Sequence, residues 1–177
     1  EHHDDFPGVE VQSEAVRRYD TTCAAHLLGT VGLMGADEWT GTRNGGPYKD
    51  KAGYRMNDYI GQTGLESALE AFLHGTAGSR IVENALDGET AAEQSRSTAP
   101  QPGDNVVTTI DLDLQKVAEQ SLANNLSAYG RGGAAVALDP NSGEVLAMAS
   151  YPSYDLSTYN KDYDTIKDDS RHPLINR

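Results

Sequence analysis

The clearest pattern of hydrophobic and polar positions lies in the last third of the chain. Two apolar runs, residues 132–139 and 144–150, flank the turn-forming sequence Pro-Asn-Ser-Gly and predict an antiparallel β-hairpin. Both runs are continuously apolar, so we expect both faces of the hairpin to be covered. Because a two-stranded ribbon is not stable by itself, the missing cover must come from further chain or from a partner.

The residues before this hairpin have the pattern of a capped helix. Apolar and small side chains recur every three or four positions from Leu114 to Leu126, and Asp111 or Asp113 precedes them as a capping residue. The β-branched stretch 105–110 predicts a strand in front of this helix. The polar tail after the hairpin is expected to pack against other parts of the protein through its tyrosines, which are Tyr151, Tyr154, Tyr159 and Tyr163.

The first half of the chain predicts short elements of both kinds. Residues 6–19 alternate apolar and polar side chains as a half-buried strand does, and residues 21–32 have the composition of a short helix that stops at glycine. Residues 65–75 place leucine and phenylalanine at i, i+4, i+7 and i+8, which predicts an amphipathic helix with a glycine stop. Residues 79–88 predict a strand and a turn.

Two segments have the composition of loops. Residues 35–57 are rich in Gly, Asn, Asp and Lys and predict a long, solvated insertion loop. Residues 89–105 contain almost no apolar side chain and predict a linker, with a domain boundary near residue 100. The predicted fold class is therefore α+β. A mixed domain over residues 1–100 is followed by residues 106–177, whose helix and hairpin belong to a larger sandwich.

The charge and cysteine content exclude several classes of function. The chain has 14 basic and 27 acidic residues, a net charge of −13, which disfavours binding to nucleic acid and to anionic lipid. Cys23 is the only cysteine, so neither an intramolecular disulfide nor a cysteine-rich zinc site can form. No run reaches the roughly 20 apolar residues of a transmembrane helix, so we expect any membrane attachment to come from an anchor outside this sequence.

Three groups of motifs resemble those of the class B penicillin-binding proteins, the membrane-anchored D,D-transpeptidases that cross-link peptidoglycan. The first is Arg-Arg-Tyr followed by Ala-Ala-His-Leu-Leu-Gly. The second is Gly-Gln-Thr-Gly-Leu-Glu followed by Leu-His-Gly-Thr-Ala-Gly. The third, and the most specific, begins with Thr-Thr-Ile-Asp-Leu-Asp-Leu-Gln and continues through the hairpin. In order, these motifs occupy residues 17–19, 24–29, 61–66, 73–78, 108–115 and 135–152.

The resemblance implies a pedestal, or dimerisation, domain followed by the first helix and β-hairpin of the penicillin-recognising fold. It implies no cofactor and no metal, and a location at the extracytoplasmic face of the bacterial cell membrane. The implied partners are the rest of the transpeptidase domain, proteins of cell-wall elongation or division, and a second copy of the chain. The motif residues with an implied structural role are Arg17, Tyr19, His26, Gly29, Gly61, Gly64, Glu66, Gly75, Gly78, Asp111, Gln115, Asp139 and Gly143.

Transpeptidases of this family need a serine with a lysine three residues later, a Ser-x-Asn and a Lys-Thr-Gly or Lys-Ser-Gly. No serine from Ser13 to Ser170 has Lys at the third or Asn at the second following position, and no Lys precedes Thr-Gly or Ser-Gly. The resemblance places the nucleophile shortly after an Asn-Arg such as Asn176-Arg177. We therefore expect this stretch to be the non-catalytic part of a serine-type transpeptidase.

Several residues also allow other interpretations. Glu66 has the chemistry of a catalytic carboxylate, but its place at a helix start favours an ion pair with Arg17 or Arg18. His26 and His74 are interpreted as hydrogen-bonded structural histidines, and Cys23 as a small buried thiol rather than a nucleophile.

The polar terminus and the tyrosine-rich tail leave further alternatives open. The terminal ligand types His2, His3, Asp4 and Asp5 are a weak candidate for a metal site. The tail tyrosines could stack on sugars, although packing against the remainder of the catalytic domain is favoured. Competing functions are an enzyme with a different catalytic arrangement and an independent extracellular wall-binding or adhesin-like domain.

Overall fold

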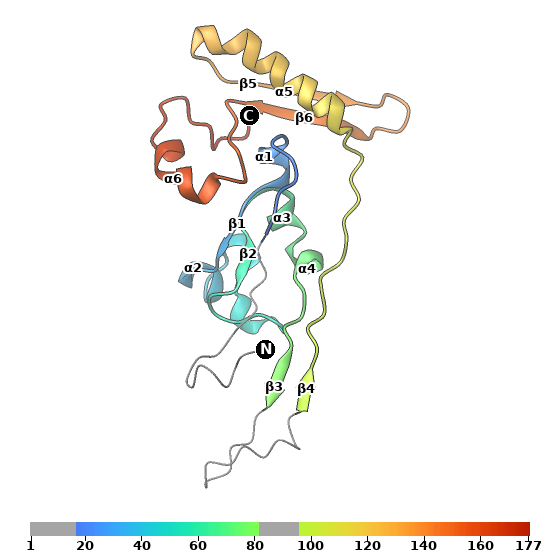
Figure 1. The fold of residues 1–177 in the computed structure, drawn as a ribbon, viewed down its shortest axis with the longest axis vertical. Helices are drawn as coiled ribbons and strands as arrows, with labels where there is room; N and C mark the ends of the chain where they lie inside the picture. Colours follow the sequence, from blue (N-terminus) through green and yellow to red (C-terminus); the bar gives the residue numbers. More distant parts are fainter. Residues whose placement is uncertain (1–16, 82–95) are drawn as a thin grey trace, which may run out of the picture.

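A computed structural model describes residues 17–81 and 96–177 of the chain. Small elements are stacked beneath a long helix that lies on a hairpin (Figure 1). The pedestal, residues 17–81 and 96–104, contains α1 (Ala25–Leu28), β1 (Val31–Leu33), α2 (Ala36–Trp39), 3₁₀ turns at Arg43–Gly45 and Tyr48–Asp50, β2 (Tyr59–Gly61), α3 (Gly64–Ala68), α4 (Glu70–Leu73), β3 (Ser79–Ile81) and β4 (Arg96–Thr98).

The upper part of the molecule is built around one helix and one hairpin. Its elements are α5 (Leu112–Leu126), a 3₁₀ turn at Ser127–Tyr129, β5 (Gly133–Leu138), β6 (Val145–Tyr151) and α6 (Tyr159–Lys167). The strands pair antiparallel as β1 with β2, β3 with β4 and β5 with β6. The mixed architecture is the predicted α+β class.

The predicted hairpin and its preceding helix are confirmed. In the hairpin Gly133 pairs with Tyr151 and Ala137 with Ala147, and the register shifts between Ala137 and Leu138. Asp111 is the N-cap of α5, because its Oδ1 accepts hydrogen bonds from the backbone N–H groups of residues 113 and 114.

The predicted burial of these elements is only partly correct. One side of α5 packs on the hairpin, whereas Val136 and Leu138 on β5 remain 58% and 56% exposed. The hairpin is therefore not covered on both faces within the described chain. The apolar stripe assigned to α5 is also rotated, since Gln115 is fully buried while Val117 is 64% exposed.

The predicted solvated loop at residues 35–57 is only partly correct: most of its side chains are exposed, but the segment also forms α2 and two 3₁₀ turns and contributes to the hydrophobic cluster of the pedestal. Tyr48 is 2% exposed and packs with Met34 and Ile60, and Trp39 and Tyr54 lie against this cluster. The Tyr48 hydroxyl donates a hydrogen bond to a backbone carbonyl in the preceding 3₁₀ turn. The glycines and asparagines of the segment thus shape tight turns around buried aromatic rings.

Two predicted helices are shorter or differently oriented than expected. Of residues 21–32 only Ala25–Leu28 form helix, because the chain crosses into β1 directly afterwards. Residues 65–75 form two short helices that break at Leu69. Their buried side chains are Glu66 and Glu70, while Phe72 is 59% exposed. The inward side of these helices is therefore the one that carries the buried carboxylates, not the one that carries the apolar stripe.

The predicted strand 105–110 and the predicted linker 89–105 also differ from the structure. Residues 105–110 form no strand ladder and run upward beside the pedestal into α5 (Figure 1). Within the predicted linker, β4 pairs with β3, and Gln101 forms an isolated bridge with Thr76. Most of the predicted strands at residues 6–19 and 79–88 lies outside the described residues; residues 17–19, which are described, form no strand. Within residues 17–81 and 96–177, no helix has the length and apolarity to cross a membrane.

Replacing the buried Ile60 should reveal the importance of the pedestal cluster. Ile60→Ala removes apolar contacts from a side chain with no solvent exposure and leaves a cavity. We expect the free energy of unfolding to fall by about 2–5 kcal/mol, as measured by urea denaturation. The matched control is Leu33→Ala on the neighbouring strand, where the side chain is 57% exposed and the expected loss is below about 1 kcal/mol.

Candidate functional site at the junction of the two parts

The pedestal meets the helix–hairpin unit at α1, which lies directly beneath β6 (Figure 1). The residues leading into α1 are small and buried: Cys23, Ala24 and Ala25 are 5%, 4% and 2% exposed. The predicted buried thiol is confirmed, and its Sγ lies 3.0 Å from Thr21 Oγ1. The two parts therefore approach each other through backbone and short side chains.

A buried polar network joins α5, β6 and α1 across this junction. The Gln115 side-chain amide donates to the carbonyl of Met148 (2.9 Å) and accepts from its backbone N–H (2.8 Å), as a neighbouring strand would. The same amide donates to Glu119 Oε1 (2.7 Å), which also accepts the backbone N–H of Ala24 (2.6 Å). Glu119 thus connects the start of α1 with α5.

His26 forms a second connection between α1 and the upper part. Its Nε2 lies 2.7 Å from the carbonyl oxygen of Pro173, and its ring meets the edge of Tyr154 with ring centroids 5.1 Å apart. Burial lowers the pKa of His26, so the ring is neutral at neutral pH. Because a carbonyl only accepts, Nε2 carries the proton in this contact. The prediction of a hydrogen-bonded structural histidine is confirmed.

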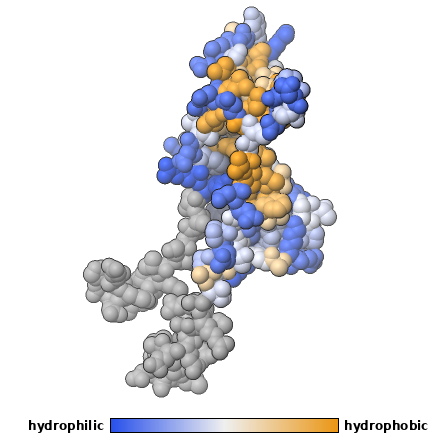
Figure 2. All heavy atoms as spheres, turned by 90° about the vertical axis from the view of Figure 1, so that its right-hand side faces the viewer, coloured by the Kyte–Doolittle hydropathy of each residue, from blue (hydrophilic) through white to orange (hydrophobic). Residues whose placement is uncertain are grey.

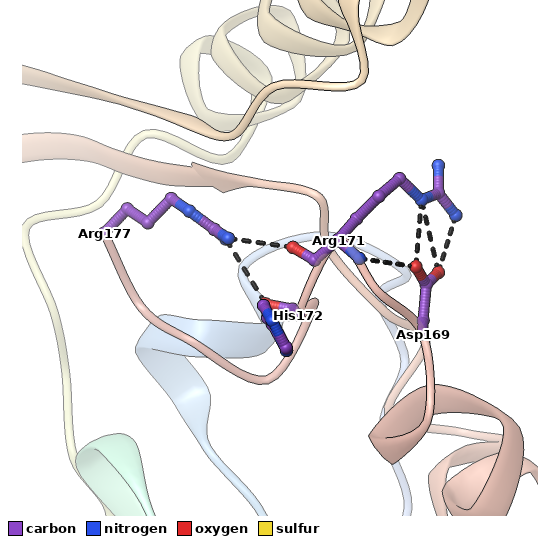
Figure 3. Close-up of polar contacts among 4 residues, drawn as sticks. All are labelled: Asp169, Arg171, His172 and Arg177. Carbon is purple, nitrogen blue, oxygen red and sulfur yellow. Dashed lines mark hydrogen bonds and ion pairs between the residues drawn. The ribbon is translucent and has the colours of Figure 1, made fainter.

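The segment that contains Pro173 is held in shape by arginine side chains (Figure 3). Arg177 donates hydrogen bonds to the backbone carbonyls of Arg171 (2.8 Å) and His172 (3.3 Å). Asp169 pairs with Arg171, whose hydrogen bonds lower the pKa of Asp169 to about 2. Ser150 Oγ donates to Asn176 Oδ1 and accepts the backbone N–H of Arg177, so the segment is also fastened to β6.

The predicted ion pair at the top of the pedestal is present. Arg17 hydrogen bonds to Glu66, whose side chain is 8% exposed, whereas the neighbouring Arg18 pairs with Asp20 near the surface. The Arg17 guanidinium lies 6.0 Å from the ring centre of Tyr19. Glu66 is therefore a paired structural carboxylate within the described chain.

The two glycines Gly29 and Gly64 make a crossing that no larger residue could form. Gly29 has φ = 86° and Gly64 has φ = 58°, and a Cβ on Gly29 would lie 1.9 Å from the carbonyl oxygen of Thr63. A Cβ on Gly64 would lie 2.7 Å from the Cα of Gly29. The end of α1 and the start of α3 are thus in direct backbone contact. Gly61, the last residue of β2, contacts the backbone of Glu66 in the same crossing.

The other predicted motif residues lie away from this crossing. Gly75 and Gly78 contact the chain around Gln101 and Thr98 at the opposite end of the pedestal. Asp139 and Gly143 belong to the turn of the hairpin, where Asp139 accepts two backbone N–H groups that lower its pKa. The structure thus brings together Arg17, Tyr19, His26, Gly29, Gly61, Gly64 and Glu66, with Asp111 and Gln115 above them.

Glu119, Ser150 and Arg177 are junction residues that no sequence pattern predicted. Glu119 stands on a helix face that periodicity assigned to solvent, and Ser150 is an ordinary strand residue in the sequence. Each has at least one partner far along the chain, Ala24 for Glu119 and each other for Ser150 and Arg177, so no local pattern marks them. The tail tyrosines were placed against the remainder of the catalytic domain, yet Tyr154 contacts His26 and Tyr159.

The face that carries α4 and the ascending segment has a hydrophobic area at mid-height (Figure 2). A shallow groove there is lined by Leu65, Leu69, Leu73, Val106 and the Arg17–Glu66 pair. Within residues 17–81 and 96–177 no group of three or more His, Cys, Asp or Glu side chains has the arrangement of a metal site, and the candidate at residues 2–5 lies outside these ranges.

The family model of the "Penicillin-binding Protein dimerisation domain" matches residues 1–108 of the chain. The chain belongs to this family. It covers the dimerisation region of a class B penicillin-binding protein, as the resemblance implied, and continues beyond it into the helix–hairpin unit.

Curated relatives and solved structures agree with this assignment. The chain is 34% identical to the peptidoglycan D,D-transpeptidase MrdA of Acinetobacter baumannii and 35% identical to that of Escherichia coli K12, over 97% of the chain in each case. It spans 24% and 26% of those two proteins, about a quarter of their length.

Two solved structures share the fold and are 26% and 32% identical in sequence to this chain. The complex between PBP2 and MreC from Helicobacter pylori has a TM-score of 0.66 and 26% identity, over 88% of this chain and 27% of that one. Pseudomonas aeruginosa PBP2 in complex with WCK 5153 has a TM-score of 0.58 and 32% identity, over 94% of this chain and 30% of that one. The dimerisation domain and the helix–hairpin unit thus occur together in penicillin-binding proteins of known structure.

Reversing the charge of Glu66 should destabilise the dimerisation domain. Glu66→Lys places a cation in a nearly buried position opposite Arg17. We expect a loss of about 1–3 kcal/mol in the free energy of unfolding, less than for a fully buried pair because Arg17 is half exposed. Thermal melting checks this loss. The double variant Arg17→Glu with Glu66→Lys should recover part of it, and an unchanged melting temperature in the single variant would contradict the role of the pair.

Removing the Gln115 amide should loosen the edge of β6. Gln115→Leu keeps a similar volume but leaves the N–H and C=O of Met148 without their partners, at an expected cost of about 3 kcal/mol. Hydrogen exchange at the Met148 amide should accelerate in parallel with the loss of stability. Gln120→Leu, on the exposed side of the same helix, is the matched control and should leave both quantities unchanged.

Proposed function

We infer that this chain serves as the pedestal of a peptidoglycan D,D-transpeptidase and holds the catalytic domain in a fixed orientation. The observation that carries this inference is the pair of polar connections from α1 to the upper part, Ala24 to Glu119 and His26 to Pro173. A domain that merely tethered its neighbour would not need partly buried hydrogen bonds across the junction. The names of the MrdA relatives support the reaction class.

The remainder of the transpeptidase domain is the first partner that we propose. The outer edge of β6 is occupied: Thr109 Oγ1 donates to Val145 O, the Asp111 N–H to Leu146 O, and Gln115 bonds to Met148. On the other side of the hairpin, no described strand pairs with the free edge of β5. A free strand edge with exposed apolar side chains recruits further strands. The catalytic sheet therefore continues from β5.

The second proposed partner is a scaffold protein of cell-wall elongation. The Helicobacter pylori PBP2, with the same fold over 88% of this chain, was solved in complex with MreC. A dimerisation-domain assignment also supports association with a second copy of the chain. We place the protein at the extracytoplasmic face of the cell membrane, where its peptidoglycan substrate lies.

We propose that the chemistry itself resides outside these residues. Three of the described side chains with suitable chemistry have structural partners: Glu66 pairs with Arg17, and His26 bonds to the Pro173 carbonyl. Cys23 is buried beside Thr21. None of them stands in a nucleophile–base pair. The tyrosines do not support an independent wall-binding function, because their rings pack on one another. The ring of Tyr159 contacts those of both Tyr154 and Tyr163.

Labelling with a fluorescent penicillin tests whether the catalytic residues lie outside this chain. The full-length protein should become covalently labelled, because acylation of the transpeptidase serine is stable, whereas the 177-residue chain should stay unlabelled at the same concentration. Gel fluorescence after denaturation measures both. A covalent adduct on the 177-residue chain would assign catalysis to these residues, and an unlabelled full-length protein would remove the transpeptidase function.

A further inference from the structure

The C-terminal segment 171–177 is a rigid turn that touches both parts of the molecule. Its chain reverses near His172, which has φ = 53°, and the Arg177 guanidinium closes the turn by bonding to the carbonyls of Arg171 and His172 (Figure 3). The guanidinium also bonds to the carbonyl of Ile175. Ser150 on β6 binds the Arg177 backbone. A displacement of Pro173 is therefore passed on to Arg177 instead of being absorbed within the turn.

The pedestal contacts this turn through His26. The Nε2–H bond to the Pro173 carbonyl is 2.7 Å long, Pro173 is buried, and the edge contact with Tyr154 fixes the plane of the imidazole ring. The bond is directional, because the donor lies in the ring plane and its acceptor belongs to a buried backbone group. It thus constrains position and angle, which an apolar contact of the same area would not.

The two connections of α1 reach different elements from adjacent places. The N–H of Ala24 is held by Glu119 of α5, and two residues later His26 holds the turn. One short helix with two separate attachments cannot rotate without breaking one of them. The orientation of the pedestal is thereby transmitted to the turn, independently of the sheet.

We propose that His26 is a positioning residue for acyl transfer: by holding the turn at Pro173 it sets where the chain leaving Arg177 enters the active site. This inference rests on the proposed function, in which the nucleophile belongs to the same protein and follows this turn. His26 does not touch the reacting atoms. Its effect is on the rate of acylation, since small displacements of a reacting group are costly even when the fold is intact.

The experiment uses the full-length protein with His26→Leu, His26→Gln and Ile60→Val. His26→Leu keeps apolar volume but removes the donor, whereas Gln places its side-chain N–H₂ near the position of Nε2 and can bond to the Pro173 carbonyl. Ile60→Val lies in the pedestal cluster and destabilises the domain without touching the junction. The second-order rate constant of acylation by a fluorescent penicillin and the melting temperature are measured for each variant.

We expect His26→Leu to lower the acylation rate constant about tenfold, His26→Gln to restore most of it, and Ile60→Val to lower only the melting temperature. Acylation of His26→Leu at the wild-type rate would overturn the inference while leaving the proposed function in place. It would also be overturned if Gln failed to rescue the rate, or if Ile60→Val slowed acylation as much as His26→Leu. An unlabelled wild-type protein would instead remove the proposed function itself.

Discussion

Gln115 has no solvent exposure, and its side-chain amide bonds to both backbone groups of Met148 on β6. A buried strand edge left without partners would cost about 1–3 kcal/mol for each unpaired group. One helix residue thereby does at this position what a neighbouring strand does elsewhere. Because the same amide also donates to Glu119, which accepts the N–H of Ala24, the connection continues from the sheet into the pedestal. The placement of the two parts depends on this chain of bonds.

The pedestal uses buried carboxylates in the same way. Glu38 accepts the N–H of Gly35, Glu70 accepts that of Gly61, and Glu66 pairs with Arg17, although these side chains are only 3–8% exposed. Glu70 Oε1 also lies 3.1 Å from His74 Nδ1, outside good hydrogen-bond geometry. The partners of these carboxylates differ: Glu38 binds the backbone N–H that precedes α2, Glu70 binds the last N–H of strand β2, and Glu66 binds a side chain. A buried carboxylate is stable only with such partners, which makes each of these contacts specific.

The sequence predicted the elements whose pattern is local and failed where tertiary contacts decide. Asp111, the apolar repeat of α5 and the hairpin turn at Asp139 and Gly143 carry their own signals, and the helix and hairpin form as predicted, although their buried faces differ from the predicted ones. The Arg17–Glu66 pair was predicted from its motif. Within residues 35–57 the exposed loop residues were predicted, but the buried ring of Tyr48 was missed because the surrounding glycine and asparagine suggest a fully solvated loop.

The prediction of a single helix at residues 65–75 failed for a related reason. Its leucine pattern predicted one amphipathic helix, but the partners of Glu66 and Glu70 lie far along the chain or at the crossing with β2, where no periodicity reveals them. The junction residues Glu119 and Arg177 were missed likewise, since Glu119 binds the backbone N–H of Ala24 and Arg177 binds the backbone carbonyl of Tyr151, both far along the chain. A side chain that bonds to a remote backbone group is not marked by any pattern in the residues next to it.

The small size of the residues around α1 explains why hydrogen bonds, rather than apolar packing, must fix the junction. Cys23, Ala24 and Ala25 bury little apolar surface, so they contribute little to holding the two parts together. They do let the backbone of α1 approach α5 closely enough for Ala24 to reach Glu119 at 2.6 Å. Apolar surfaces tolerate sliding, whereas two short directional bonds from one helix define an angle. A larger side chain at position 24 or 25 would add apolar area but separate these partners, and the pedestal would hold its neighbour without orienting it.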